Sequence, residues 1–97
     1  MRVIARRTLR EFWERHPDAE PSLVAWFHEV SHAKWDGPSD IKERYASASF
    51  LRGDRVVFNI KGNKYRLVVS VWYSGKSVYI RFVGTHAEYD RIDAEEI

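Results

Sequence analysis

The stretch that decides the fold is RVVFNIKGNKYRLVVSVWYSGKSVYIRFV, residues 55–83, because strand-forming runs alternate in it with turn signals. The pairs Gly62-Asn63 and Ser74-Gly75 suit two-residue hairpin turns, since glycine tolerates a positive φ. The stretch therefore predicts an antiparallel meander of three strands. Each expected strand is rich in Val, Ile, Tyr and Phe with alternating character, and the three cover Arg55 to Lys61, Lys64 to Tyr73 and Lys76 to Val83.

Two-residue turns would determine the register of this meander and sort its side chains between two faces. Ile60 would face Tyr65, Val69 would face both Val56 and Ile80, and Leu67 would face Phe82. Because successive side chains alternate between faces, one face is almost wholly apolar, and we expect helices to cover it. The opposite face is expected to be exposed and to carry Arg55, Val57, Asn59, Lys61, Lys64, Arg66, Val68, Ser70, Tyr79, Arg81 and Val83.

The expected exposed face is cationic. Between Arg55 and Ala87 there are six Lys or Arg residues and no Asp or Glu. In the expected register Arg66 and Arg81 are diagonal neighbours, about 7–8 Å apart at the backbone and within reach of one phosphate. Arginine can hold phosphate oxygens through two donors, so this face favours a polyanion such as RNA. Alternatively, these residues only solvate an open sheet face.

The first half of the chain has helical periodicity. Leu9, Phe12 and Trp13 recur at helical spacing, and Thr8 stands three residues before Glu11, as in a capping box. Together with the meander, this predicts an α+β fold with helices on one sheet face. The other expected elements are a strand at Val3-Ile4-Ala5, a helix from about Ala19 to Lys34, a helix capped by Ser39 that runs to about Tyr45, and a capped helical turn at Thr85-His86-Ala87-Glu88.

Length and composition limit the possible classes of protein. Ninety-seven residues, 44% of them hydrophobic, predict one domain over residues 1–97 with a packed core. The chain has no cysteine, which excludes disulfides and thiolate chemistry and is compatible with a cytoplasmic location. No stretch approaches the roughly 20 apolar residues of a membrane-spanning helix. His28 and His32 have the spacing of a helical metal pair, but no third ligand is evident, so we expect no metal site.

Two segments resemble the HigB toxins of the RelE superfamily. They are VFNIKGNKYRL, residues 57–67, and GTHAEYD, residues 84–90. The start of the chain, a short strand followed by a helix and a proline break, is similar too, so the resemblance covers nearly the whole chain. It implies a microbial-RNase-like fold, in which N-terminal helices pack on one face of a twisted antiparallel sheet.

The resemblance also implies an activity and its partners. It implies a ribosome-dependent endoribonuclease that cuts mRNA without a cofactor. A HigA-type helix-turn-helix antitoxin would neutralise it, and operator DNA would be contacted only through the toxin–antitoxin complex. Two alternatives remain open from the residues alone: a nucleic-acid-binding module that does not cut, and a protein-interaction domain whose basic face docks an acidic partner.

Four residues are candidates for catalysis by attack of the RNA 2′-hydroxyl. Arg66 and Arg81 would stabilise the charged phosphorane, and the match of YRLV to the superfamily places Arg66 at a catalytic arginine. His86 would transfer a proton as acid or base, unless it is only a solvent-exposed residue of the first helical turn. Tyr89 would stack on a base or orient the phosphate, or else anchor its helix to the core.

Four further residues are expected to bind RNA beside the reacting phosphate. Lys61 and Lys64 flank the first hairpin turn, and Arg55 and Asn59 share the face of Arg66. The alternative for the two lysines is that they solvate the end of a hairpin.

Overall fold

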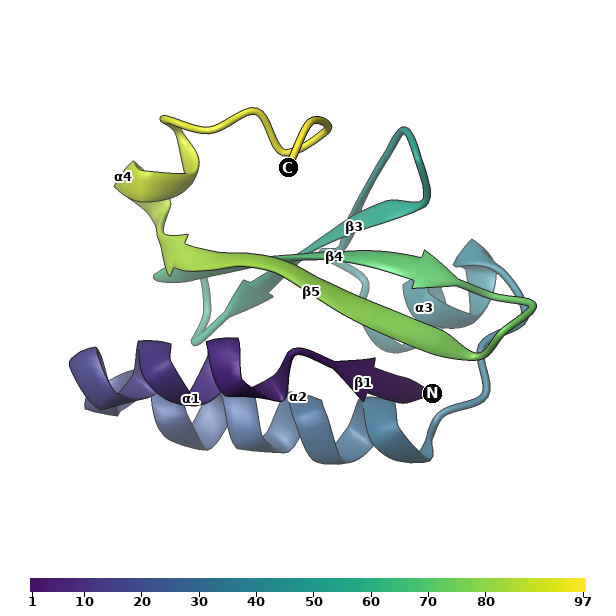
Figure 1. Ribbon diagram of the computed structural model, residues 1–97, viewed down its shortest axis with the longest axis horizontal. Helices are drawn as coiled ribbons and strands as arrows, with labels where there is room; N and C mark the ends of the chain where they lie inside the picture. Colours follow the sequence, from purple (N-terminus) through teal and green to yellow (C-terminus); the bar gives the residue numbers. More distant parts are fainter.

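A five-stranded sheet with helices on one face forms the protein, and the computed structural model describes residues 1–97 (Figure 1). The strands lie in the order β1-β5-β4-β3-β2, so the prediction of an α+β fold is confirmed. In chain order the elements are β1 (Arg2–Ile4), α1 (Arg6–Arg15), the 3₁₀ helix η1 (Pro17–Ala19), α2 (Glu20–His32), α3 (Pro38–Arg44), β2 (Ser49–Leu51), β3 (Arg55–Ile60), β4 (Tyr65–Trp72), β5 (Ser77–Thr85) and α4 (His86–Tyr89).

The sheet is mixed: four of its strands, β2 to β5, pair antiparallel as expected, and only the edge strand β1 departs from this pattern. The edge strand β1 pairs in parallel with β5, with Val3 opposite Val78. At the other edge β2, which the sequence analysis did not predict, pairs antiparallel to β3. Both edge strands have only three residues, and no local turn signal in so short a run specifies its partner or direction.

The predicted register holds for the first hairpin and for the part of the second hairpin nearest its turn, from Trp72 back to Val69. Ile60 lies opposite Tyr65, and Val69 lies opposite both Val56 and Ile80. Beyond that point a β-bulge between Val68 and Val69 shifts the pairing by one residue.

The bulge exchanges the faces of two predicted residues. Leu67 lies opposite Val83, and Phe82 lies opposite Val68, which leaves Arg81 without a partner on β4. Val83 therefore packs on the helix-covered core and Phe82 on the other face, the reverse of the prediction. A bulge inserts one unpaired residue in a strand, and strict alternation cannot anticipate it.

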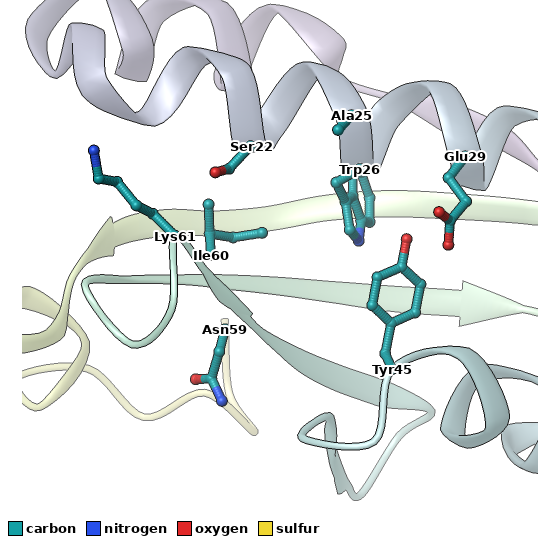
Figure 2. Close-up of a pocket in the computed structure, with 8 residues that line it drawn as sticks. All are labelled: Ser22, Ala25, Trp26, Glu29, Tyr45, Asn59, Ile60 and Lys61. Carbon is teal, nitrogen blue, oxygen red and sulfur yellow. The ribbon is translucent and has the colours of Figure 1, made fainter.

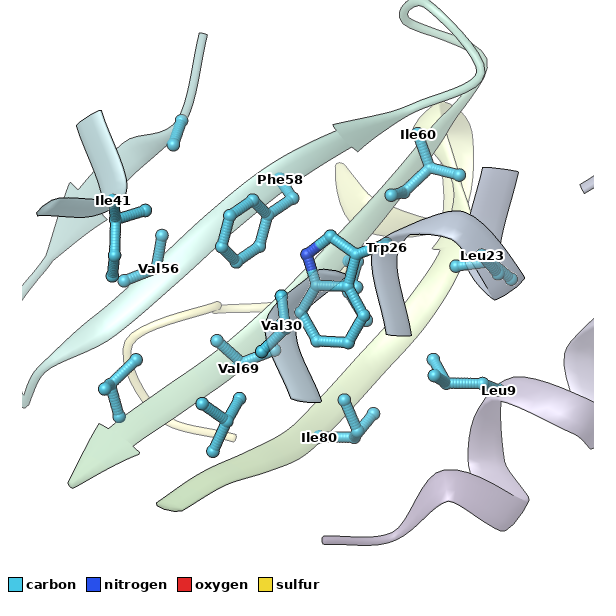
Figure 3. Packing of buried hydrophobic residues seen from close by; sticks show 14 of the residues in the cluster. Leu9, Leu23, Trp26, Val30, Ile41, Val56, Phe58, Ile60, Val69 and Ile80 are labelled. Carbon is cyan, nitrogen blue, oxygen red and sulfur yellow. The ribbon is translucent and has the colours of Figure 1, made fainter. Parts of the chain in front are cut away.

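The main core lies between the sheet and helices α1 and α2. Leu9 and Phe12 of α1 and Leu23, Trp26 and Val30 of α2 are buried in it. These side chains meet the apolar face of β3, β4 and β5, where Val56, Phe58, Leu67, Val69, Val78 and Ile80 are buried (Figure 3). None of the helices is long and apolar enough to cross a bilayer.

Helix caps agree with the sequence at only one of three positions. Thr85 and Glu88 form the predicted capping box of α4. Helix α1 begins two residues before Thr8, directly after a left-handed Ala5, and has no side-chain cap. Helix α3 has Gly37 at its N-cap in place of Ser39. Helix α1 begins two residues after β1 ends, and α3 begins six residues after α2 ends. The preceding element therefore sets where each helix begins, rather than a capping side chain.

The second face of the sheet is covered, although it was expected to be exposed. Val57, Val68 and Ala94 are buried together there, because residues 92–97 cross this face opposite to α1 and α2 (Figure 1). Three of the six residues in this covering segment are acidic, so its apolar side chains form no regular pattern that predicts burial. The residues packed around this smaller cluster are Leu51, Phe82, Tyr89, Ile92 and Ile97.

Replacing Leu67 by Ala should destabilise the protein by about 2–5 kcal/mol, since it removes a fully buried side chain from the central strand. Chemical denaturation measures the free energy of unfolding. The control, Val24→Ala, truncates an exposed apolar residue of α2 and should change it by less than about 0.5 kcal/mol. Equal effects of the two changes would contradict this description of the core.

Candidate active site

Helix α4 places His86 at the end of β5, beside the start of β4. The hydroxyl of Thr85 accepts a hydrogen bond from the Glu88 amide at 3.1 Å, and Glu88 accepts one from the Thr85 amide at 2.8 Å. The hydrogen bond from the Thr85 backbone lowers the pKa of Glu88, so the capping carboxylate is held in its charged form. This capping box sets the orientation in which His86 leaves the strand.

Arg66 and His86 are in direct contact. Nη2 of Arg66 lies 2.8 Å from Nε2 of His86. A guanidinium can only donate, so Nε2 accepts and the imidazole proton is on Nδ1. Nδ1 lies 3.4 Å from a carboxylate oxygen of Asp90, one helical turn further along. The imidazole is therefore held between a guanidinium and a carboxylate.

The guanidinium of Arg66 also contacts an aromatic ring, and one of its donors is buried without a partner. Its Cζ atom lies 5.2 Å from the centre of the Tyr89 ring, within cation–π range. Tyr89 also packs on the smaller apolar cluster, as the anchoring alternative expects. Nε of Arg66 is buried without a partner, and so is Oδ1 of Asn59, the residue directly opposite on β3. Arg66 thus has hydrogen-bonding capacity that no protein atom uses.

Arg81 lies apart from this group, so the expected arginine pair is wrong. Arg66 faces Gly84. Arg81 is three residues along β5 from Gly84, which is about 10 Å at the usual rise of a strand. Arg81 donates from Nε to Ser70 Oγ at 3.0 Å and lies over the Tyr79 ring, further along the sheet from His86. The bulge causes this separation, because it adds one residue between the two arginines.

Three of the four expected RNA-binding residues, Arg55, Lys61 and Lys64, have protein partners. Arg55 donates from Nε to the main-chain oxygen of Ile97 at 2.9 Å and so holds the covering segment. Nζ of Lys61 and Nζ of Lys64 lie 3.6 and 2.5 Å from Oδ2 of Asp18. Both lysines therefore share one carboxylate, which the sequence places far away in η1.

A cleft of about 670 Å³ opens beside His86. Asp18 is its one carboxylate, and Tyr65 donates to Asp18 Oδ1 at 2.5 Å. Hydrogen bonds from Lys64 and Tyr65 hold the pKa of Asp18 well below its usual range, and the same carboxylate raises the pKa of Lys64. The cleft is lined by Arg15, His16, Pro17, Asp18, Lys64, Tyr65, Thr85, His86 and Ala87.

A second, smaller cavity of about 170 Å³ lies between α2 and β3 (Figure 2). The indole nitrogen of Trp26 and the hydroxyl of Tyr45 point into it. Burial raises the pKa of Tyr45, and Trp26 Nε1 is buried without a partner. This cavity does not include Arg66 or His86. No group of three or more His, Asp or Glu side chains could hold a metal ion.

Four residues of this region were not predicted from sequence as site residues. Asp90 could have been found, because it stands four residues after His86 and such pairs meet on one helix face. Arg15, His16 and Asp18 had no local signal. They reach the cleft only because the end of α1 and the helix η1 pack beside the hairpin of β3 and β4.

The fold is compatible with that of RelE-like toxins, and comparison with known proteins gives the family. Residues 19–92 match the family model of the HigB toxin, described as the RelE-like toxic component of a toxin–antitoxin system. The mRNA interferase toxin HigB of Escherichia coli K12 is 30% identical over 92 residues, which cover 93% of this chain and 88% of that protein.

Two further relatives are also named mRNA interferase HigB. The mRNA interferase HigB of Shigella flexneri is also 30% identical over 92 residues, with the same coverage. The mRNA interferase HigB of Escherichia coli O6:H1 is 18% identical over 94 residues, which are 95% of this chain and 91% of that protein. The chain belongs to the HigB toxin family.

The Asp18 contacts predict a pH-dependent contribution to stability. Since folding lowers the pKa of Asp18, the contribution is fully present above the ordinary aspartate pKa of about 3.9. It is lost as pH falls below that value towards the lower pKa of the folded state. Asp18→Asn should therefore lower Tm at pH 7, and the difference from the parent should narrow as pH falls below 4.

Thermal melts followed by circular dichroism between pH 2.5 and 7 measure this difference. Glu14→Gln makes the same change at an exposed residue of α1 without an ion pair, and it should leave Tm unchanged across the range. If the difference in Tm between Asp18→Asn and the parent stays constant with pH, the lowered pKa assigned to Asp18 is wrong.

Proposed function

We propose that this chain is an mRNA endoribonuclease that acts as the toxin of a toxin–antitoxin pair, with Arg66 and His86 at its reacting centre. The observation that carries the proposal is the 2.8 Å contact between the Arg66 guanidinium and Nε2 of His86. The relatives are named mRNA interferases, which supports the choice of substrate. We further propose that residues 1–97 act as one domain in the cytoplasm.

The proposed reaction uses the 2′-hydroxyl of the RNA as its nucleophile. The 2′-oxygen forms a bond to the adjacent phosphorus, and the bond from phosphorus to the 5′-oxygen of the next nucleotide breaks. The proton of the 2′-hydroxyl passes to a base of the protein, and a water molecule supplies the proton that reaches the departing 5′-oxygen. The products are a 2′,3′-cyclic phosphate and a 5′-hydroxyl end.

His86 is proposed to take the proton from the 2′-hydroxyl through Nε2. In the free protein this nitrogen accepts from Arg66. A phosphate oxygen is a stronger acceptor for a guanidinium than a neutral imidazole, because the hydrogen bond then joins two charged groups. When the scissile phosphate attracts Arg66, Nε2 is released and can act as the base. Asp90, whose carboxylate lies 3.4 Å from Nδ1, is proposed to keep the proton on that nitrogen and the lone pair on Nε2.

The guanidinium of Arg66 is then placed to stabilise the phosphorane, whose charge exceeds that of the bound phosphate. Tyr89 lies against this guanidinium and is proposed to orient it towards the phosphate. Arg81 lies too far along β5 to share that phosphate. It is therefore proposed to bind a flanking one, as are Lys61 and Lys64. Arg55 instead holds the covering segment, and Asn59 lies opposite Arg66 on β3.

The partners are proposals as well. Membership of a toxin–antitoxin family implies an antitoxin. We propose that it is of the HigA helix-turn-helix type, that the mRNA is cut on the ribosome, and that operator DNA is contacted only through the antitoxin complex. The alternative, a module with the same fold that binds nucleic acid or protein without cutting, leaves the contact between Arg66 and His86 without a role.

His86→Ala and Arg66→Ala should each lower the rate of mRNA cleavage by about 10²–10⁴-fold, the range for loss of a proton-transfer group or of preorganised charge. Both should abolish growth arrest while antitoxin binding is kept. Arg81→Ala should have a smaller effect on the rate, because it removes only a flanking contact. The measurements are growth after induction, and mapping of mRNA cleavage with and without ribosomes.

His28→Ala is the matched control, since His28 is an exposed histidine on α2. It should arrest growth like the parent chain. If His86→Ala and Arg66→Ala remain fully toxic, the assigned centre is wrong. If the parent chain cuts no mRNA, the non-catalytic alternative is correct.

Asp90→Asn should lower kcat and leave the affinity for mRNA-programmed ribosomes unchanged. An amide can donate to Nδ1, which would place the imidazole proton on Nε2 and remove the lone pair that the base needs. Single-turnover cleavage measures kcat, and Glu96→Gln is a control at an exposed carboxylate without an ion pair. A change in affinity with unaltered kcat would show that Asp90 binds RNA instead.

A further inference from the structure

An imidazole that the proposed chemistry does not use lines the cleft beside His86. His16, directly after α1, stacks on Phe12 with ring centres 4.4 Å apart and planes at 25°. Phe12 is buried, so one face of the imidazole rests on the core. The ring also lies 5.5 Å from that of Tyr65. The position of His16 is therefore set by packing against two aromatic rings.

Positive charge surrounds this aromatic group on two sides of the cleft. Arg15 is exposed at the end of α1 and forms no ion pair. Lys64 lies across the cleft at the hairpin, where Asp18 holds it. The cleft volume of about 670 Å³ is within the range of roughly 300–1,000 Å³ for sites that enclose a small organic ligand.

We infer that this cleft is a nucleotide subsite, in which the base next to the scissile phosphate stacks on His16 and its own phosphate pairs with Arg15 and Lys64. The inference rests on the proposed function, because it places the mRNA at His86. A flat ring supported from behind is what an unpaired base stacks on, and neighbouring cations bind its phosphate. An acidic peptide would use the cations but would leave the stacked imidazole without a role.

A cycle that combines a change in the protein with a change in the RNA tests the stacking. The protein variant is His16→Ala, and the RNA variant has an abasic residue on the 5′ or the 3′ side of the cleaved bond. Each change alone should lower kcat/KM on mRNA-programmed ribosomes by about 5- to 100-fold, the value of one base–aromatic stack. On one of the two sides, the combined loss should be no larger than either single loss.

Two controls separate stacking from folding and from general effects on charge. His16→Phe keeps a flat ring on Phe12 and should retain cleavage within about threefold. Arg15→Ser should reduce the slope of the logarithm of the binding constant against the logarithm of salt concentration by about one, the value of one phosphate contact. Arg10→Ser, at an exposed arginine outside the cleft, should leave this slope unchanged. Circular dichroism melts of every variant show whether the fold is kept.

The other outcomes overturn the subsite in distinguishable ways. Additive losses in both cycles, or no loss from His16→Ala, would show that no base stacks there while mRNA cleavage stands. Unchanged cleavage with weakened antitoxin binding in Arg15→Ser and His16→Ala would make the cleft a surface for a protein. If the parent chain cuts no mRNA on ribosomes, the proposed function and this subsite fail together.

Discussion

Burial of the central strand β4 on both faces is the constraint on which the other features depend. Leu67, Val69 and Val71 face the helices, and Val68 faces the segment of residues 92–97. A strand enclosed in this way cannot slip by one residue, because each face is specified by apolar packing. Arg66 lies near the start of this strand, where the cover is incomplete, so a rigid backbone holds a guanidinium that is half-buried and still reaches His86.

The site combines this rigid strand with a short helix whose start is fixed by its own side chains. The capping box of Thr85 and Glu88 orients His86, and β4 orients Arg66. The two groups therefore approach from adjacent strands without relying on a long loop. The cleft on the other side of His86 has a different origin, since the end of α1 and η1 form its wall.

Sequence patterns were most informative where a local signal determines the structure. Gly62-Asn63 and alternating apolar residues predicted the pairing of β3 with β4, and the capping box of α4 was predicted from Thr85 and Glu88. Non-local features were missed. The bulge beside Arg81 has no sequence signal of its own. In residues 92–97 three acidic residues are interspersed with Ile92, Ala94 and Ile97, so no regular apolar pattern marks this segment as a cover for the sheet.

Asp18 has one more consequence for the encounter with RNA. As an internal counter-ion for Lys61 and Lys64, it reduces the positive potential that the cleft projects into solution before any RNA is bound. Long-range attraction to the abundant folded RNAs of a cell, which depends on that potential, is weakened accordingly. A phosphate that enters the cleft meets Lys64 already positioned by Asp18, so binding orders little of this side chain that was free before.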